Sequence, residues 1–262
     1  MKKTFFAKGC TVSLCILLSC NVHSTAQTET DSLSLVVPQS GISDDTHRLS
    51  LTEVLIPTAA IGLSALCVNN GWLVKQRNCI QNSLSPGGDH RIKIDDYLQY
   101  SQMVAVYGLN LCGVKGKHSF VDRTIMLAMS YATMGILVNS MKYTFKEKRP
   151  DSNARNSFPS GHTATAFMGA EFLYKEYKDV SPLIGYAGYA IAAATGYLRI
   201  YNDRHYLNDV IAGACIGVLS TKFAYWLYPK CFKNAKCNQL ASIGGIPYYI
   251  QNEIGMSVFI RF

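Results

Sequence analysis

Apolar residues dominate six stretches of the chain, and polar or charged segments separate them. The six stretches are residues 51–73, 97–112, 123–141, 163–177, 182–198 and 207–228. They are near the length of about 20 residues that an α-helix needs to cross the hydrocarbon core of a bilayer. We therefore predict an all-α fold, a six-helix bundle integral to a membrane. The segment 74–96 contains Ser85-Pro86-Gly87-Gly88 and is predicted to be a polar loop.

The composition favours the same class of protein. Hydrophobic residues make up 48% of the 262 residues and charged residues only 16%, whereas charged residues account for about a quarter of an ordinary soluble domain. The formal net charge of +8 suits an anionic substrate or an anionic membrane face. The basic residues are scattered and form no nucleic-acid-binding motif, so we expect no nucleic-acid partner.

The first 26 residues have the features of a secretory signal peptide. Lysines precede a mostly apolar run at residues 10–20, which is too short to span a bilayer. Ser24-Thr25-Ala26 then supplies small residues for cleavage. In an alternative interpretation, Leu17-Leu18-Ser19-Cys20 is a lipoprotein box and Cys20 carries a lipid.

The patterns together divide the chain into four parts. These are a signal peptide at 1–26, a polar linker at 27–50, a helical domain at 51–229 and a C-terminal tail at 230–262. From residue 246 onward the tail partly alternates apolar and polar residues. This alternation is compatible with a strand or hairpin, and we expect the tail to pack on the helical domain.

Three blocks within the helical domain bring together residue types that bind and attack a phosphate group. The first block is Lys142 with Arg149-Pro150, the second is Phe158-Pro159-Ser160-Gly161-His162, and the third is Arg199, His205 and Asp209. Phosphoryl transfer needs positive charge and N–H donors around three equatorial oxygens. Lys142, Arg149 and Arg199 can supply the charge. The helix expected to begin near His162 offers free N–H groups and the positive end of a dipole.

The two histidines and the aspartate indicate covalent catalysis. His205 and Asp209 are four residues apart, so on a helix they would share one face and could touch. An aspartate that accepts a hydrogen bond from one ring nitrogen fixes the tautomer and exposes the other nitrogen as a nucleophile. His162 would then be free to protonate the leaving oxygen.

Together the three blocks resemble the type 2 phosphatidic acid phosphatase family, which shares its site with vanadium haloperoxidases and bacterial class A acid phosphatases. By this resemblance, His205 is the nucleophile that forms a phosphohistidine, Asp209 orients it, and His162 is the general acid. The resemblance assigns phosphate binding to Lys142, Arg149, Arg199 and the amides of Ser160 and Gly161. It implies no metal or other cofactor. Leu198 stands where the family usually has a serine, which removes one possible hydroxyl contact.

The resemblance also implies a place and a substrate. The chain is similar to bacterial lipid A phosphatases, so we expect removal of the 1- or 4'-phosphate of lipid A at the periplasmic face of the inner membrane. Undecaprenyl diphosphate and phosphatidylglycerophosphate are alternative substrates. A soluble periplasmic acid phosphatase of broad specificity is the alternative class of protein.

The expected signal and the expected site conflict in topology. In membrane members of the family, six spans place the site at the outer face and both chain ends inside. A cleaved signal would instead put Gln27 outside, and three spans counted from there put Lys142 inside. Either the N-terminal segment is not translocated, or one early helix does not span, or the chain after the signal is a periplasmic bundle.

Overall fold

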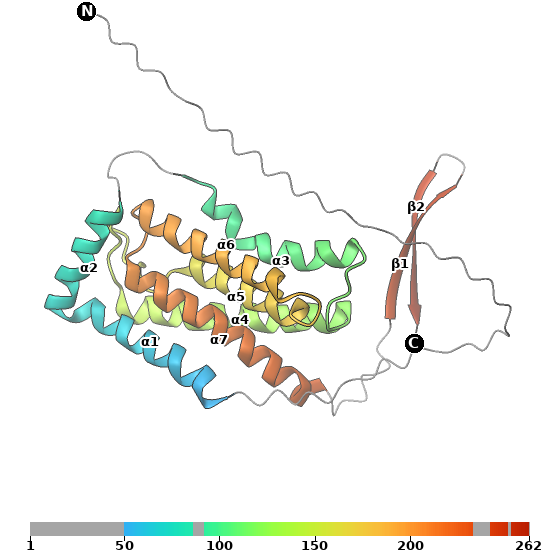
Figure 1. The fold of residues 1–262 in the computed structure, drawn as a ribbon, viewed down its shortest axis with the longest axis horizontal. Coiled ribbons are helices and arrows are strands. Elements are labelled where there is room, and N and C mark those ends of the chain that lie inside the picture. Colours follow the sequence, from blue (N-terminus) through green and yellow to red (C-terminus); the bar gives the residue numbers. More distant parts are fainter. Residues whose placement is uncertain (1–49, 86–91, 233–241, 251–252, 262) are drawn as a thin grey trace, which may run out of the picture. The chain divides into compact units, whose positions relative to one another are not determined.

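The computed structural model describes residues 50–85, 92–232, 242–250 and 253–261, which form seven helices and one hairpin (Figure 1). The helices are α1 (Leu51–Asn69), α2 (Gly71–Leu84), α3 (Asp95–Leu111), α4 (Phe120–Phe145), α5 (Gly161–Tyr177), α6 (Pro182–Tyr201) and α7 (Leu207–Phe232). The strands are β1 (Ser242–Ile250) and β2 (Glu253–Arg261). The predicted signal peptide and all but the last residue of the predicted linker lie outside the described residues.

Helix α2 corrects the prediction of a loop at 74–96. Asn70 ends α1 and also caps α2, because its side chain accepts hydrogen bonds from the backbone N–H groups of Trp72 and Leu73. Helix α2 is too polar to be recognised by an apolar periodicity. Its stability comes from contacts with distant loops, as tertiary packing can stabilise a helix of weak pattern. The described residues therefore contain seven helices rather than six.

Helix α5 is the central element of the bundle. It is buried at 13 of its 17 residues, and α3, α4, α6 and α7 all pack against it. Helix α7 approaches α5 closely, because Gly213 and Gly217 have no side chain to separate the two backbones. A Cβ atom at Gly217 would lie only 2.3 Å from the carbonyl oxygen of Ala164. Small residues allow this kind of close approach between membrane helices.

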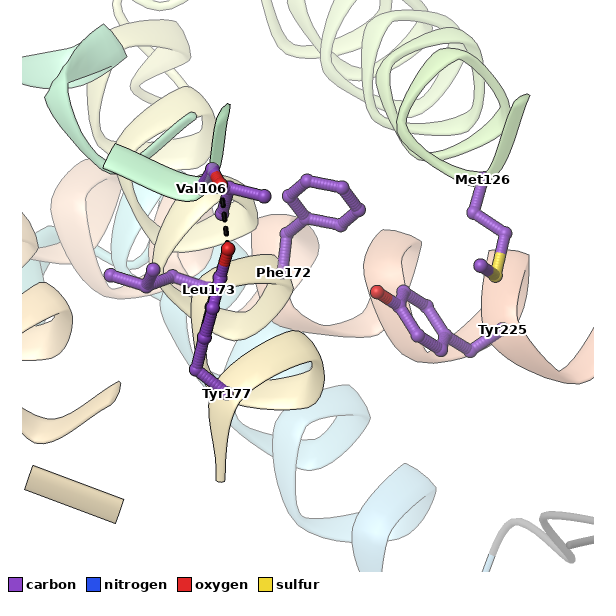
Figure 2. Packing of buried hydrophobic residues seen from close by; sticks show 6 residues of the cluster. All are labelled: Val106, Met126, Phe172, Leu173, Tyr177 and Tyr225. Atoms are coloured by element: carbon purple, nitrogen blue, oxygen red, sulfur yellow. Dashed lines mark hydrogen bonds between the residues drawn. The ribbon is translucent and has the colours of Figure 1, made fainter. Parts of the chain in front are cut away.

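Three clusters of buried apolar residues form the core among the described residues, and one of them lies between α3, α4, α5 and α7 toward the C-terminal end of α5. Figure 2 shows its buried members, Val106, Met126, Phe172, Leu173, Tyr177 and Tyr225. The hydroxyl of Tyr177 donates a hydrogen bond to the carbonyl oxygen of Val106 at 2.8 Å. This satisfies the one polar group that the ring of Tyr177 brings into the core.

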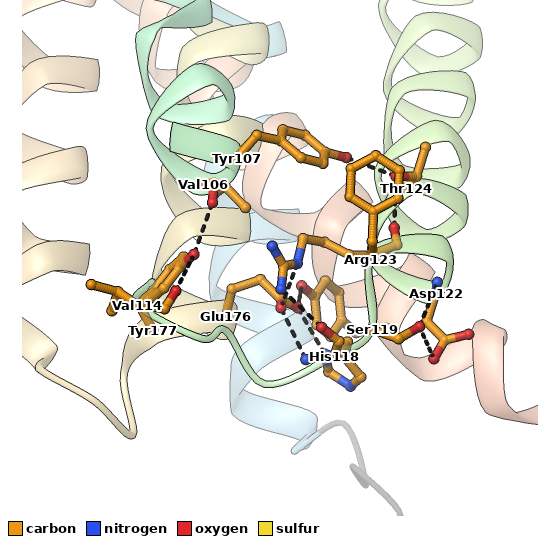
Figure 3. Close-up of polar contacts among 12 residues, drawn as sticks. Val106, Tyr107, Val114, His118, Ser119, Asp122, Arg123, Thr124, Glu176 and Tyr177 are labelled. Carbon is orange, nitrogen blue, oxygen red and sulfur yellow. Dashed lines mark hydrogen bonds and ion pairs between the residues drawn. The ribbon is translucent and has the colours of Figure 1, made fainter. Parts of the chain in front are cut away.

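A buried polar cluster closes the same end of the bundle (Figure 3). Glu176, near the end of α5, accepts a hydrogen bond from Arg123 Nε at 3.1 Å and from the Tyr225 hydroxyl at 2.5 Å. His118 Nδ1 lies 2.7 Å from the same carboxylate. These contacts tie α4, α5 and α7 to the segment that precedes α4. A buried carboxylate is tolerated because its oxygens are paired and hydrogen-bonded.

Three of the described helices, α1, α4 and α7, are long and apolar enough to cross a membrane. Only 6% of the most apolar stretch of α1 is buried inside the protein. Its large apolar side chains, among them Leu55, Ile56, Leu63 and Leu66, are exposed. An apolar surface of this kind is suited to lipid, so the chain is a membrane protein.

The strands form an antiparallel two-stranded hairpin within the region predicted to be a tail. Its register runs from Ser242 opposite Arg261 to Ile250 opposite Glu253. Helix α7 extends to Phe232, a few residues beyond the predicted end of the last helix at residue 228.

The close approach of α5 and α7 can be tested with two glycine substitutions. We expect Gly217→Ala to lower the free energy of unfolding by about 1–3 kcal/mol, because the methyl group meets the Ala164 backbone. Gly135→Ala on α4 is the matched control, since a Cβ there meets nothing within 4 Å. The control should be stabilised by up to about 1 kcal/mol through helix propensity. Thermal and denaturant unfolding in detergent measures both, and equal stability of the two variants would contradict the packing.

Candidate active site

The eight residues to which the sequence analysis assigns roles gather at the end of the bundle opposite the Glu176 cluster. The last turn of α4 carries Lys142 and the last turn of α6 carries Arg199. Residues 160–162 open α5, and residues 205–209 lead into α7. The N-terminal end of α3 lies here as well. Three helix N-termini, each with a partial positive charge that favours an anion, therefore lie at this end beside the C-termini of α4 and α6, whose negative ends carry Lys142 and Arg199.

His205 and Asp209 lie side by side and are fully enclosed. His205 Nδ1 is 3.5 Å from Asp209 Oδ2, and the two side chains are 1% and 0% exposed. The pair does not share a helix face as predicted, because α7 begins only at Leu207 and His205 belongs to the turn before it. The turn brings the pair together because the backbone N–H of Tyr206 donates to Asp209 Oδ2 at 3.1 Å.

Ser157 is a further partner of Asp209 that the sequence blocks did not include. Its hydroxyl donates to Asp209 Oδ2 at 2.5 Å. Its backbone N–H donates to the carbonyl oxygen of Glu147 at 3.0 Å, which folds the loop back on itself. The only signal in the sequence was its position directly before the Phe158-Pro159-Ser160-Gly161-His162 block.

The electrostatic environment keeps His205 neutral. Burial, and after it the positive charges of Arg199, Arg149 and Lys142, hold the pKa of His205 well below its usual range. The three cations come from the last turns of α4 and α6 and from the loop between α4 and α5. A neutral imidazole retains an electron pair on one ring nitrogen, which is the form that can act as a nucleophile.

Ser160 is the N-cap of α5. Its hydroxyl lies 2.9 Å from the hydroxyl of Thr163 and 3.5 Å from the Thr163 backbone nitrogen. Its own backbone N–H donates to the carbonyl oxygen of Asp209 at 3.0 Å. This amide, which the sequence assigned to phosphate, is thus already used to join α5 to α7. The amide of Gly161, the first residue of the helix, lies next to it.

Arg199 and His162 are held by two acids that sequence reasoning missed, Asp95 and Asp96 in the first turn of α3. Arg199 Nη1 lies 2.8 Å from Asp95 Oδ2 and 3.2 Å from Asp96 Oδ1. His162 Nε2 lies 3.0 Å from the same Asp96 Oδ1. In the sequence the acids precede Arg199 by more than 100 residues, and their only local signal was two acidic residues at a helix start.

Helix α2 fastens the two loops that carry Arg149 and His205. Arg77 forms an ion pair with Glu147, and its guanidinium carbon lies 4.2 Å from the centre of the Tyr206 ring. Gln81 Nε2 donates to the carbonyl oxygen of Ile200 at 2.9 Å and to Asp203 Oδ1 at 2.7 Å. The helix that the sequence pattern did not reveal is therefore a support of the site.

Arg149 lies in the loop between α4 and α5, whose shape the backbone fixes. Lys146 ends α4 in a left-handed conformation with φ 46°, so the chain turns back over the bundle. The backbone N–H of Arg149 donates to the carbonyl oxygen of Ala154 at 3.0 Å. Arg204 Nη1 lies 3.1 Å from Asp151 Oδ2 and links this loop to the turn of His205. Within the described part of the chain, no group of three or more histidine, cysteine or acidic side chains is arranged to hold a metal.

Comparison with known proteins gives one family match. The family model described as the PAP2 superfamily matches residues 123–233, a span that contains all three blocks. The chain is 32% identical over 216 residues to a lipid A 1-phosphatase of Porphyromonas gingivalis, covering 82% of this chain and 47% of that protein. It is also 40% identical over 75 residues to the bacitracin transport permease protein BcrC of Bacillus licheniformis, covering 29% of this chain and 35% of that protein. The chain thus spans about half or less of these relatives.

A solved structure supports the fold. The chain resembles the crystal structure of the first transmembrane PAP2 type phosphatidylglycerolphosphate phosphatase from Bacillus subtilis with a TM-score of 0.52. The match covers 71% of this chain and 100% of that one at 18% identity. At this identity the comparison concerns the arrangement of the helices.

The ionisation of Glu147, the partner of Arg77 on α2, can be tested through the pH dependence of stability. Burial, followed by the charge of Asp209, raises the pKa of Glu147 from 4.5 to about 7, although Arg77 opposes the shift. A carboxyl group whose pKa is higher in the folded state stabilises the fold below the unfolded pKa, and this contribution is lost as the pH rises through the folded pKa. We expect a loss on the order of 3 kcal/mol between about pH 4.5 and pH 7.

Glu147→Gln should lack this component of the pH dependence, because glutamine does not titrate. The measurement is the free energy of unfolding in detergent for wild type and variant across this pH window. The difference between the two curves reports the titration of Glu147 together with its electrostatic coupling to Asp209. Parallel curves for the two proteins would show that Glu147 does not titrate in this way.

Proposed function

Residues 123–233 form a PAP2 superfamily domain, and from this premise we propose that the protein is a membrane phosphatase that hydrolyses a lipid phosphate through a phosphohistidine. The observation that carries the proposal is the enclosed pair of His205 and Asp209, in which His205 is kept neutral. The charges of Arg199, Arg149 and Lys142 act on this histidine. They would offset the negative charge on the equatorial oxygens of the transferring phosphoryl group.

The reaction has two steps. In the first, Nε2 of His205 forms a bond to phosphorus while the bond between phosphorus and the ester oxygen breaks. Asp209 faces Nδ1 and stabilises the positive charge that develops on the ring. His162 gives its proton to the departing oxygen. In the second step, water attacks phosphorus, the neutral His162 takes a proton from that water, and orthophosphate leaves a neutral His205.

The backbone at the start of α5 contributes a donor to the phosphate. We assign this contact to the amide of Gly161, because the Ser160 amide donates to the carbonyl oxygen of Asp209. Ser160 keeps its part as the N-cap that shapes the turn. Glycine has no side chain, so the phosphate can approach the backbone closely.

Two candidate spans contribute residues to the site, which supports a position at a membrane surface. Lys142 lies in the last turn of α4 and Asp209 in the first turn of α7, and both helices are candidate spans. A phosphate group on a lipid is held at this depth, whereas its acyl chains extend into the bilayer. We propose that this surface is the periplasmic face of the inner membrane.

The substrate we propose is lipid A, with its 1-phosphate as the group removed. The support is the identity of 32% over 216 residues with a protein named lipid A 1-phosphatase. The chemistry agrees, since a cluster of cations at a membrane surface suits a lipid whose head group carries phosphate.

The nucleophile can be tested by trapping the intermediate. After brief exposure to a radioactively labelled phosphate ester and an alkaline quench, the wild type should carry an acid-labile label. We expect His205→Ala to lose both label and turnover. Asp209→Asn should reduce kcat by roughly 10³- to 10⁴-fold, by analogy with the loss of tautomer control in Ser-His-Asp enzymes. Full activity of His205→Ala would exclude the mechanism.

The substrate can be tested with the purified protein in detergent. Bisphosphorylated lipid A should lose one phosphate, and fragmentation in mass spectrometry should place the loss at the 1-position. Undecaprenyl diphosphate and phosphatidylglycerophosphate serve as competing substrates in the same assay. A higher kcat/KM for either competitor, with the lipid A phosphate count unchanged, would reject lipid A while leaving the phosphatase reaction intact.

A further inference from the structure

Asp95 has the geometry of a fixed support for Arg199. It is 2% exposed, and its Oδ2 lies 2.8 Å from Arg199 Nη1 and 3.4 Å from Asn202 Nδ2. Arg199 is buried as well, and its Nε finds no hydrogen-bond partner within the described part of the chain. A buried guanidinium N–H without an acceptor is costly, so this group is available for an anion that enters the site.

Asp96 has a different geometry from its neighbour. Its side chain is 54% exposed, and a single oxygen, Oδ1, lies 3.0 Å from His162 Nε2 and 3.2 Å from Arg199 Nη1. The carboxylate therefore joins the residue we assign as general acid to a residue we assign to phosphate binding. Acids in the first turn of a helix often have only a structural role, because their negative charge interacts favourably with the positive end of the helix dipole. The helix dipole alone does not explain a contact with both functional side chains.

We propose that the two acids that open α3 are positioning residues of the phosphatase site, Asp95 for Arg199 and Asp96 for His162. Asp95 holds one edge of the guanidinium so that Nε is left to the phosphate. Asp96 holds the imidazole of His162 in place and favours its protonated form, which is the form that can donate a proton to the leaving oxygen. This inference rests on the phosphatase function proposed above.

The charges around His162 explain why it needs such a partner. Burial and the positive charge of Arg199 on α6 lower the pKa of His162, whereas Asp96 and Asp95 on α3 oppose this. His205, in the turn before α7, also interacts electrostatically with His162. Without the carboxylate of Asp96, the imidazole would lose its proton at a lower pH. The general acid would then be absent over more of the working range.

Two substrates with different leaving groups distinguish support of the general acid by Asp96 from a purely structural role. A p-nitrophenolate anion leaves without a proton, whereas the alkoxide of an alkyl phosphate must be protonated as it departs. We expect Asp96→Asn to reduce kcat/KM by roughly 10- to 100-fold for a dialkylglycerol phosphate in detergent. For p-nitrophenyl phosphate the reduction should be less than about threefold. The alkaline limb of the alkyl phosphate profile should also move to lower pH, because His162 would be deprotonated sooner.

Three further variants complete the experiment. Asp96→Glu keeps the carboxylate and should restore most of the alkyl phosphate activity. Asp95→Asn should instead raise KM for both substrates and raise the Kd of orthovanadate, a mimic of the transferring phosphoryl group, because Arg199 loses its support. Asp179→Asn removes an exposed carboxylate at the other end of the bundle and should leave both activities and the pH profile unchanged.

The outcomes distinguish this inference from the function on which it rests. Wild type without activity on either ester would defeat the proposed phosphatase. An active wild type combined with an equal loss of both activities in Asp96→Asn would overturn the role of Asp96 and indicate a structural effect. A tighter Kd for orthovanadate in Asp96→Asn with unreduced alkyl phosphate turnover would also overturn it, since Asp96 would then only compete with phosphate for Arg199.

Discussion

Through its hydrogen bonds, Asp209 links more segments of the site than any other single residue described above. Its carbonyl oxygen accepts from the Ser160 amide, and its Oδ2 accepts from Ser157 and from the Tyr206 amide. The same carboxylate oxygen faces His205. The start of α5, the loop before it and the turn before α7 are thus held by one side chain and one peptide group. This arrangement requires α5 and α7 to be close together, which the absence of a side chain at Gly213 allows.

A second constraint is the balance of charge at the site. Three cations act on one buried histidine, and isolated buried charges are strongly unfavourable. Acids from other segments offset the arginines that surround the site. Asp95 and Asp96 pair with Arg199, Glu147 pairs with Arg77, and Asp151 pairs with Arg204. Lys142 and Arg149 have no such partner among the ion pairs described here, and in the proposed function a bound phosphate would offset their charge.

The sequence predicted those features whose determinants are local. Helices α3 to α7 were predicted from apolar stretches. The three blocks lie at one end of the bundle because the helices between them, α5 and α6, are antiparallel. Asp95 and Asp96 could not be found in this way, since their partner Arg199 is more than 100 residues distant and no periodicity links them. Helix α2 was missed for a related reason: Arg77 and Gln81 stabilise it through Glu147, Tyr206 and Ile200. The roles of the site residues remain predictions.

The packing of α1 narrows the topological alternatives. Near its start, Glu53 pairs with Lys222 in the second half of α7 at 3.4 Å. Near its end, the carbonyl oxygen of Ser64 accepts from Asn208 at 3.5 Å, in the first turn of α7. Helix α1 is therefore antiparallel to α7, and its first residue lies at the end of the bundle away from the site. If α1 spans and the site is periplasmic, residue 51 is cytoplasmic. A cleaved signal would instead deliver residue 27 to the periplasm. Cleavage and a periplasmic site are therefore compatible only if α1 does not span the membrane.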